Sequence, residues 1–241
     1  MAFSKASFNK PQIEKFFKFE PACLTAAGSI LDLDTISKNG RFYVTPEGNQ
    51  YPSMTTILGA TSDKTYLDEW RERIGADKAD RISHYASSRG SDMHNICEAY
   101  VRGDKSYLDD VTPVGKKLFF QIKQFLDVNL GTVFGIEQAL YSDKHKTAGR
   151  TDLIGIYKNK RSVIDYKSSG EFKSEDWIND YFVQGAGYAT LFTWMTDIEV
   201  EQIVILVGVE NGIRGQEFTV PYSDYKEQFE ARVNAYSALI G

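Results

Sequence analysis

The sequence predicts an α/β fold, with a mixed central β-sheet flanked by helices and an N-terminal helical region before it. Three observations predict this fold class. Helical periodicity dominates before residue 130, short apolar runs typical of strands dominate after it, and one helical segment separates these runs. With 241 residues, of which 42% are hydrophobic and 13% aromatic, the chain can bury a sizeable core. We expect one domain over 1–241, made of an extension (1–50), a helical region (51–130) and a core (131–241).

A hairpin and several helices are expected in the N-terminal half. The segment Gly40–Pro52 predicts a hairpin that turns at Pro46-Glu47-Gly48. Ser53 is suited to cap a first short helix, and Asp63 or Thr65 to start the next one. Breaks or bends of the helical region are expected at Gly75 and over Ser87–Gly90.

The C-terminal half is predicted to hold the sheet. A last helix of the helical region carries Leu118, Phe119, Ile122, Phe125 and Leu126 at helical spacing and stops at Gly131. Strands are then expected over Val133–Leu140, Arg150–Tyr157, Ser162–Tyr166, Val200–Glu210 and Arg214–Val220. Helices are expected over Asp176–Trp194 and Ser223–Ile240.

Composition and charge restrict the function classes. No apolar run approaches the roughly 20 residues of a membrane helix, and the N-terminus lacks the pattern of a signal peptide. Two cysteines, Cys23 and Cys97, cannot build a four-thiolate iron–sulfur site, and they favour a reduced, cytoplasmic setting. The net charge of −5 argues against a protein that coats nucleic acid nonspecifically. The segment from Tyr141 to Lys173 is nevertheless basic, with eight lysines and arginines against four acids.

Two of those acids and one lysine stand on strands that otherwise look buried. Asp152 lies in one predicted strand, and Asp165 and Lys167 in the next. A turn centred on Asn159 brings Asp152 close to the other two, and a small bulge or register shift places all three on one face. Two carboxylates that lie side by side on one face repel each other and need a compensating positive charge. Lys167 and a divalent cation are both candidates for it.

The helix after these strands carries a polar-aromatic stripe. Trp177, Tyr181, Gln184 and Tyr188 follow one another at helical spacing, while a second stripe is purely apolar. One face can therefore pack in the core while the other faces a cleft. An amphipathic helix with a wide aromatic core face would produce the same pattern.

These motifs together resemble the PD-(D/E)XK nucleases, and among them the RecB-like branch. The resemblance rests on Gly149–Asp152, Asp165–Lys167 and Gln184–Tyr188, which are similar in order and spacing to G-x-x-D, D-x-K and Q-x-x-x-Y. It extends over roughly Tyr51 to Thr193 and is strongest toward the mitochondrial genome maintenance exonucleases and their phage relatives. The chain departs from many such nucleases by having Asp165 in place of Glu.

The resemblance implies a restriction-endonuclease-like core and a role for each motif residue. Asp152, Asp165 and the Tyr166 carbonyl would bind Mg²⁺ or Mn²⁺ together with His94, and Glu98 and Glu137 would support the site. Lys167 would position or deprotonate a water or stabilise the phosphate, and Gln184 would orient the water or a phosphate. Phosphate contacts are expected from Lys144, Lys146 and Arg150, and support or base stacking from Trp177, Tyr181 and Tyr188.

The expected activity is metal-dependent hydrolysis of DNA from free ends, preferentially of single strands, in the cytoplasm of a bacterium or a phage-infected host cell. Two alternatives remain open among enzymes: a duplex-processing recombination exonuclease and a structure-specific endonuclease. A degenerate nuclease fold that only binds DNA is the non-enzymatic alternative. The intact set of Asp152, Asp165 and Lys167 argues against it.

Overall fold

A five-stranded mixed sheet forms the centre of the computed structural model, which describes residues 17–23 and 28–241. Its strands follow the chain in order: β4 (Leu130–Ser142), β5 (Thr147–Tyr157), β6 (Lys160–Ser169), β7 (Gln202–Val209) and β8 (Gln216–Pro221). Only β6 and β7 are parallel, and α5 (Asn179–Thr196) provides the crossover that parallel neighbours need. The predicted fold class is therefore confirmed. The expectation about a signal peptide falls on residues 1–16, outside the described part.

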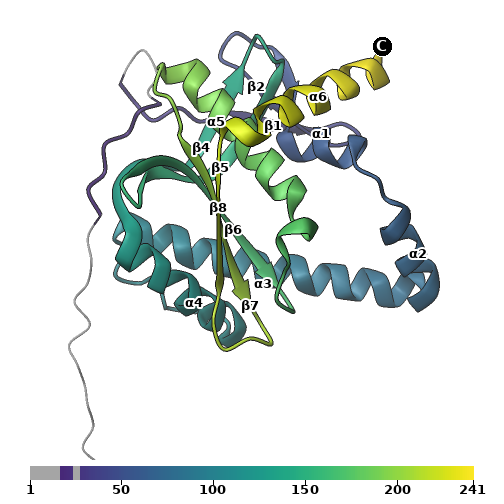
Figure 1. Ribbon diagram of the computed structural model, residues 1–241, viewed down its shortest axis with the longest axis vertical. Helices are drawn as coiled ribbons and strands as arrows, with labels where there is room; N and C mark the ends of the chain where they lie inside the picture. Colours follow the sequence, from purple (N-terminus) through teal and green to yellow (C-terminus); the bar gives the residue numbers. More distant parts are fainter. Residues whose placement is uncertain (1–16, 24–27) are drawn as a thin grey trace, which may run out of the picture.

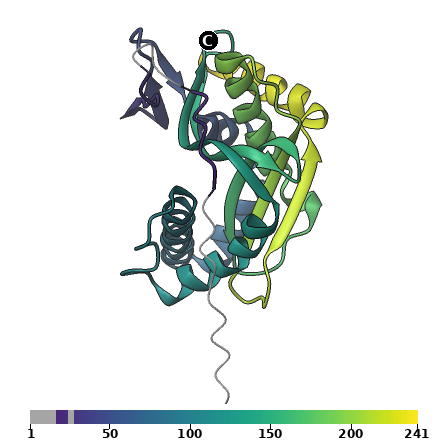
Figure 2. The same ribbon diagram turned by 90° about the vertical axis from the view of Figure 1, so that its left-hand side faces the viewer.

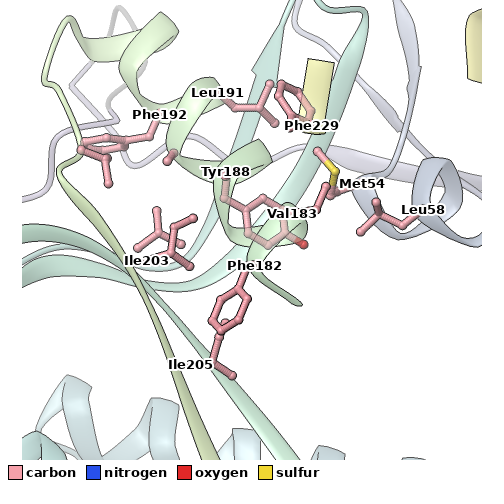
Figure 3. Packing of buried hydrophobic residues seen from close by; sticks show 14 of the residues in the cluster. Met54, Leu58, Phe182, Val183, Tyr188, Leu191, Phe192, Ile203, Ile205 and Phe229 are labelled. Carbon is pink, nitrogen blue, oxygen red and sulfur yellow. The ribbon is translucent and has the colours of Figure 1, made fainter. Parts of the chain in front are cut away.

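Helices cover both faces of this sheet. On one face lie α1 (Met54–Thr61), α5 and α6 (Ser223–Ile240), and on the other α3 (Ala76–Arg102) and α4 (Pro113–Asn129), joined to α1 through α2 (Thr65–Ile74). Figure 2 shows α3 and α4 together beside the sheet, opposite α5 and α6. Met54, Phe182 and Phe229 pack with Ile203 of the sheet on the first face (Figure 3). Two apolar cores, separated by the sheet, thus hold three layers together.

A second sheet of three short strands lies at the edge of the fold. It consists of β1 (Asp34–Ser37), β2 (Arg41–Val44) and β3 (Gln50–Pro52). The expected hairpin supplies β2 and β3, and β1 is an additional strand. Directly after β3, the Ser53 side chain accepts a hydrogen bond of 3.0 Å from the Thr56 amide and caps α1, as predicted.

Three local predictions are wrong. Helix α3 runs unbroken through Ser87–Gly90, because a serine or glycine in a helix interior costs only about 1 kcal/mol, which the burial of Met93 and Ile96 further along the same helix outweighs. The expected helix over Asp176–Trp194 is split into a 3₁₀ turn, Glu175–Trp177, and α5. The hairpin between β5 and β6 turns on two residues, Lys158 and Asn159, both with positive φ, rather than on three.

Other boundaries agree with expectation. Gly75 separates α2 from α3 with φ +85°, and the helix over Pro113–Asn129 ends just before Gly131. None of the helices in the described ranges has the length and hydropathy that crossing a bilayer requires.

Candidate active site

The candidate site lies where β5 and β6 separate. Their ladder ends at the pair Leu153–Ile164; beyond it β5 continues beside β4 and β6 beside β7. The two-residue turn sets the register Leu153–Ile164, and one residue further along this register Asp152 falls opposite Asp165. Of the two expected alternatives, a small bulge or a register shift, the structure has the register shift. Backbone groups at the opening lose their strand partners and need others. The Tyr166 amide accordingly donates to Asp152 Oδ2 at 2.7 Å.

Because the amide and carbonyl of one strand residue point to the same side of the strand, the Tyr166 carbonyl also faces the Asp152 side. The Tyr166 side chain points the other way, into the core beneath α3, and its ring lies 5.8 Å from the His94 ring in an edge-to-face contact. The arrangement is compatible with the expected carbonyl ligand.

His94, Glu137 and Asp152 form a compact donor group. One ligand atom from each lies within 4.8 Å of the others, and His94 Nδ1 is 3.4 Å from Asp152 Oδ1. Helix α3 supplies the imidazole and strands β4 and β5 supply the carboxylates, so three elements converge here. One nitrogen and several carboxylate oxygens suit Mn²⁺ or Mg²⁺, and the residues present therefore fit a divalent cation.

Asp165 and Lys167 form the other half of the site. They point from β6 toward α5, where Lys167 Nζ contacts Asp165 Oδ2 and donates to Gln184 Oε1 at 3.2 Å. Gln184 Nε2 in turn donates to the Tyr188 hydroxyl at 3.0 Å. A continuous polar chain therefore leads from the sheet to α5.

Tyr188 anchors that chain and is not available to a base. Its side chain is 4% exposed, and its ring lies directly over Gly149, where an added Cβ would come within 2.7 Å of Tyr188 Cε1. The glycine of the G-x-x-D motif is thus required by the tyrosine of the Q-x-x-x-Y motif. Tyr181 of the same helix lies beside Lys167, with the centre of its ring 5.0 Å from Lys167 Nζ.

Burial and the crowded charges shift the pKa values of the site. Burial raises the pKa of Asp165 to about 6 even though Lys167 lies beside it, and burial, with Asp152 and Glu98 nearby, raises the pKa of Glu137 to about 7. For Asp152, His94 and Lys167 outweigh the burial penalty and hold its pKa below the usual value. Burial alone would lower the pKa of both His94 and Lys167, but the carboxylates raise both. Three carboxylates therefore crowd two cationic side chains, and a bound cation would favour the ionised forms of Asp165 and Glu137.

The backbone at Glu137 is unusual for a strand. Glu137 has φ +47°, in the left-handed region that non-glycine residues seldom adopt. Two guanidinium groups bind the carbonyls there: Arg102 Nη2 donates to the Ile136 carbonyl at 3.2 Å, and Arg150 Nη1 to the Glu137 carbonyl at 2.7 Å. These contacts hold the irregular segment and aim the Glu137 carboxylate at His94 and Asp152.

A hollow of about 490 Å³ opens over these groups, hereafter the cleft. Its lining includes most of the residues expected in the site: His94, Glu98, Glu137, Arg150, Asp152, Asp165, Lys167, Gln184 and Tyr188. Glu98 is held by Arg102 through an ion pair of 2.8 Å. One wall of the cleft is lined by small residues of α3, namely Ala86, Ser87, Gly90 and Ser91. Their small side chains leave room for the cleft, which explains why this stretch is rich in the serine and glycine that suggested a break in the helix.

Three residues expected to bind substrate are placed elsewhere. Lys144 and Lys146 lie in the turn between β4 and β5, and at about 3.3 Å per strand residue Lys146 is roughly 20 Å from Asp152. Trp177 is 75% exposed in the 3₁₀ turn and lines a different hollow with Tyr66 and Lys173. The prediction that Trp177 shares one helix face with Tyr181, Gln184 and Tyr188 is therefore wrong, because Trp177 precedes α5. Arg150 does line the cleft but is also bound to Asp32 and the Glu137 carbonyl.

Two cleft residues from outside the motif-bearing elements were not foreseen from the sequence. Arg41 on β2 and Thr55 on α1 line the cleft although both are far from the motifs in the chain. No local pattern marks either of them, so only the packing of the small sheet and α1 against β5 could identify them.

No protein-family model and no curated protein sequence matches the chain. Among solved structures, a protein described as SSO0001 is similar over 62% of this chain and 74% of its own, at 17% identity and a TM-score of 0.35. A phage-related exonuclease from Haemophilus somnus 129PT is similar over 62% of this chain and 93% of its own, at 13% identity and a TM-score of 0.29. At these TM-scores neither similarity assigns a function to this chain.

Proposed function

We propose that the chain is a metal-dependent deoxyribonuclease that hydrolyses phosphodiester bonds from the free ends of single-stranded DNA. The observation that carries this proposal is the convergence of three carboxylates, one imidazole and one lysine where β5 and β6 separate, beneath an open cleft. A bound Mg²⁺ or Mn²⁺ would supply a water of lowered pKa and neutralise the phosphate.

The residues of the chain account for the remaining requirements. His94, Glu137, Asp152 and Asp165 would hold the cation, with the Tyr166 carbonyl beside them. Lys167 carries its positive charge within the cleft, where it stabilises the charge that builds up on the phosphate oxygens during attack. Gln184, held by Tyr188, fixes the direction of the Lys167 ammonium group. A purely DNA-binding protein would gain nothing from burying Asp165 and Lys167 in this way.

The preference for single strands over duplex rests on charge. Duplex binding along many phosphates requires an extended basic surface, whereas the net charge is −5 and Lys144 and Lys146 lie far from the cleft. Of the three aromatic residues expected to stack on bases, only Trp177 is widely exposed. The preference for free ends follows the resemblance to exonucleases described above.

The test compares linear single-stranded, blunt duplex and circular single-stranded DNA at equal nucleotide concentration with Mn²⁺, Mg²⁺ or EDTA. We expect metal-dependent loss of the linear single strand, slower loss of the duplex, and an intact circle. Rapid nicking of the circle would make the protein an endonuclease, and faster loss of the duplex would make it a duplex-processing exonuclease. Binding without cleavage under all metals would leave the DNA-binding alternative.

A further inference from the structure

A second hollow lies next to the cleft, along α1. It measures about 410 Å³ and shares two lining residues, Arg41 and Thr55, with the cleft. From this junction it runs past Thr56 and Gly59 to Lys64, just beyond the end of α1. We call it the α1 groove. Because both hollows are lined by Arg41 and Thr55, the α1 groove adjoins the cleft on the surface of the protein.

The chemistry of the α1 groove differs from that of the cleft. Its lining contains one arginine, one lysine, two threonine hydroxyls and one asparagine amide, and no carboxylate. Arg41 and Lys64 are exposed, and among the described residues neither side chain has an ion pair. In a protein with net charge −5, a groove without acids and with two unpaired cations favours an anionic ligand.

The position of Arg41 is built into the fold. Its amide donates to Thr56 Oγ1 at 2.9 Å, and its carbonyl accepts from Thr56 Oγ1 at 3.0 Å and from the Ser53 amide at 2.8 Å. The preceding Gly40 has φ +139°, and a Cβ there would lie 2.6 Å from Thr56 Cγ2. The turn between β1 and β2 is thereby packed on the first turn of α1, at the same end of the molecule (Figure 1), and it places Arg41 where the two hollows adjoin.

We propose that the α1 groove binds the sugar–phosphate backbone of the DNA strand next to the scissile bond, with Arg41 and Lys64 as its phosphate contacts. The proposal rests on the proposed function, because it uses the cleft as the place of cleavage. Arginine, lysine and threonine side chains are the usual partners of phosphate oxygens, and such contacts set the register of a strand without reading its sequence. Arg41 and Lys64 are therefore binding residues that position the strand, and they do not touch the reacting atoms.

The first measurement is binding without cleavage. A fluorescein-labelled oligothymidylate is titrated in EDTA with wild type, Arg41→Gln, Lys64→Gln and the control Lys160→Gln. Lys160 is also exposed, but it begins β6, at the end away from Asp165 and Lys167. The Lys160→Gln variant therefore has the same change of charge without a change in the α1 groove. We expect each groove variant to weaken binding by about two- to fivefold. Each should also flatten the slope of log affinity against log salt by about 0.7, the value for one phosphate contact on a single strand. Lys160→Gln should do neither.

The second measurement locates the contact. A set of oligonucleotides carries one uncharged methylphosphonate linkage at successive positions from the labelled end. At one position the neutral linkage should weaken wild type but leave Arg41→Gln unaffected, since the contact is already lost. Steady-state cleavage should show a raised KM and an unchanged kcat for Arg41→Gln, because the reacting groups are intact.

The outcomes separate the two proposals. If wild type cleaves DNA but both groove variants match Lys160→Gln in affinity and salt slope, the α1 groove is not a backbone site while the nuclease assignment stands. If Arg41→Gln loses kcat with unchanged KM, its role as a binding residue is overturned. A wild type that neither binds nor cleaves DNA would overturn both proposals.

Discussion

Replacing Glu137 with glutamine is expected to stabilise the metal-free protein at neutral and alkaline pH. Burial raises the pKa of this carboxyl from 4.5 to about 7, so the folded protein retains a proton that the unfolded chain loses. The free energy of unfolding therefore falls as pH rises from about 4.5 to 7, and the loss is complete above 7. Glutamine cannot ionise, so the Glu137→Gln variant does not lose this stability as pH rises.

The magnitude follows from the size of the shift. A rise from 4.5 to about 7 corresponds to about 3 kcal/mol, and we expect about 2 kcal/mol after allowing for the buried amide of glutamine. For a chain of this size, that raises Tm by roughly 4–8 °C at pH 8. At pH 5, where the folded wild type is already protonated, the difference should nearly vanish.

The assay is thermal unfolding in EDTA at pH 5 and pH 8 for wild type, Glu137→Gln and the control Glu227→Gln, an exposed change on α6. Added Mn²⁺ should then raise the Tm of wild type more than that of Glu137→Gln, because the variant has lost a ligand. A Tm difference between Glu137→Gln and wild type that is equal at the two pH values would refute the reasoning. Equal stabilisation of both by Mn²⁺ would remove Glu137 from the metal site.

Three further outcomes are expected. Asp165→Asn and Lys167→Ala should abolish metal-dependent cleavage while circular dichroism remains that of the wild type; turnover like that of wild type in either would eliminate the proposed site. His94→Ala should require a higher Mn²⁺ concentration for activity than wild type, and superimposable metal titrations would show that this imidazole is not a ligand. Gly149→Ala should destabilise the fold by about 1–3 kcal/mol in urea unfolding, because its Cβ would collide with the Tyr188 ring; an unchanged midpoint would show that the ring moves aside at no cost.

The order of helices and strands could be predicted from the sequence, and so could the meeting of Asp152 with Asp165 and Lys167. These residues lie on adjacent strands joined by a tight turn, so local rules of pairing bring them together. Even there, the choice between a two- and a three-residue turn was decided by the φ angles of Lys158 and Asn159. That choice selected the register shift over the bulge, the two alternatives that the sequence left open.

Only tertiary structure decided which distant residues complete the site. Glu137 joins His94 and Asp152 because its backbone adopts a left-handed conformation held by Arg102 and Arg150, which no sequence pattern specifies. Arg41 reaches the cleft because the small sheet packs on α1. Trp177 lies outside the cleft because α5 begins at Asn179, three residues later than predicted. Local sequence patterns reflect the hydrogen bonding and burial of residues that are neighbours in the chain. The positions of Glu137, Arg41 and Trp177 depend instead on packing between elements far apart in the chain.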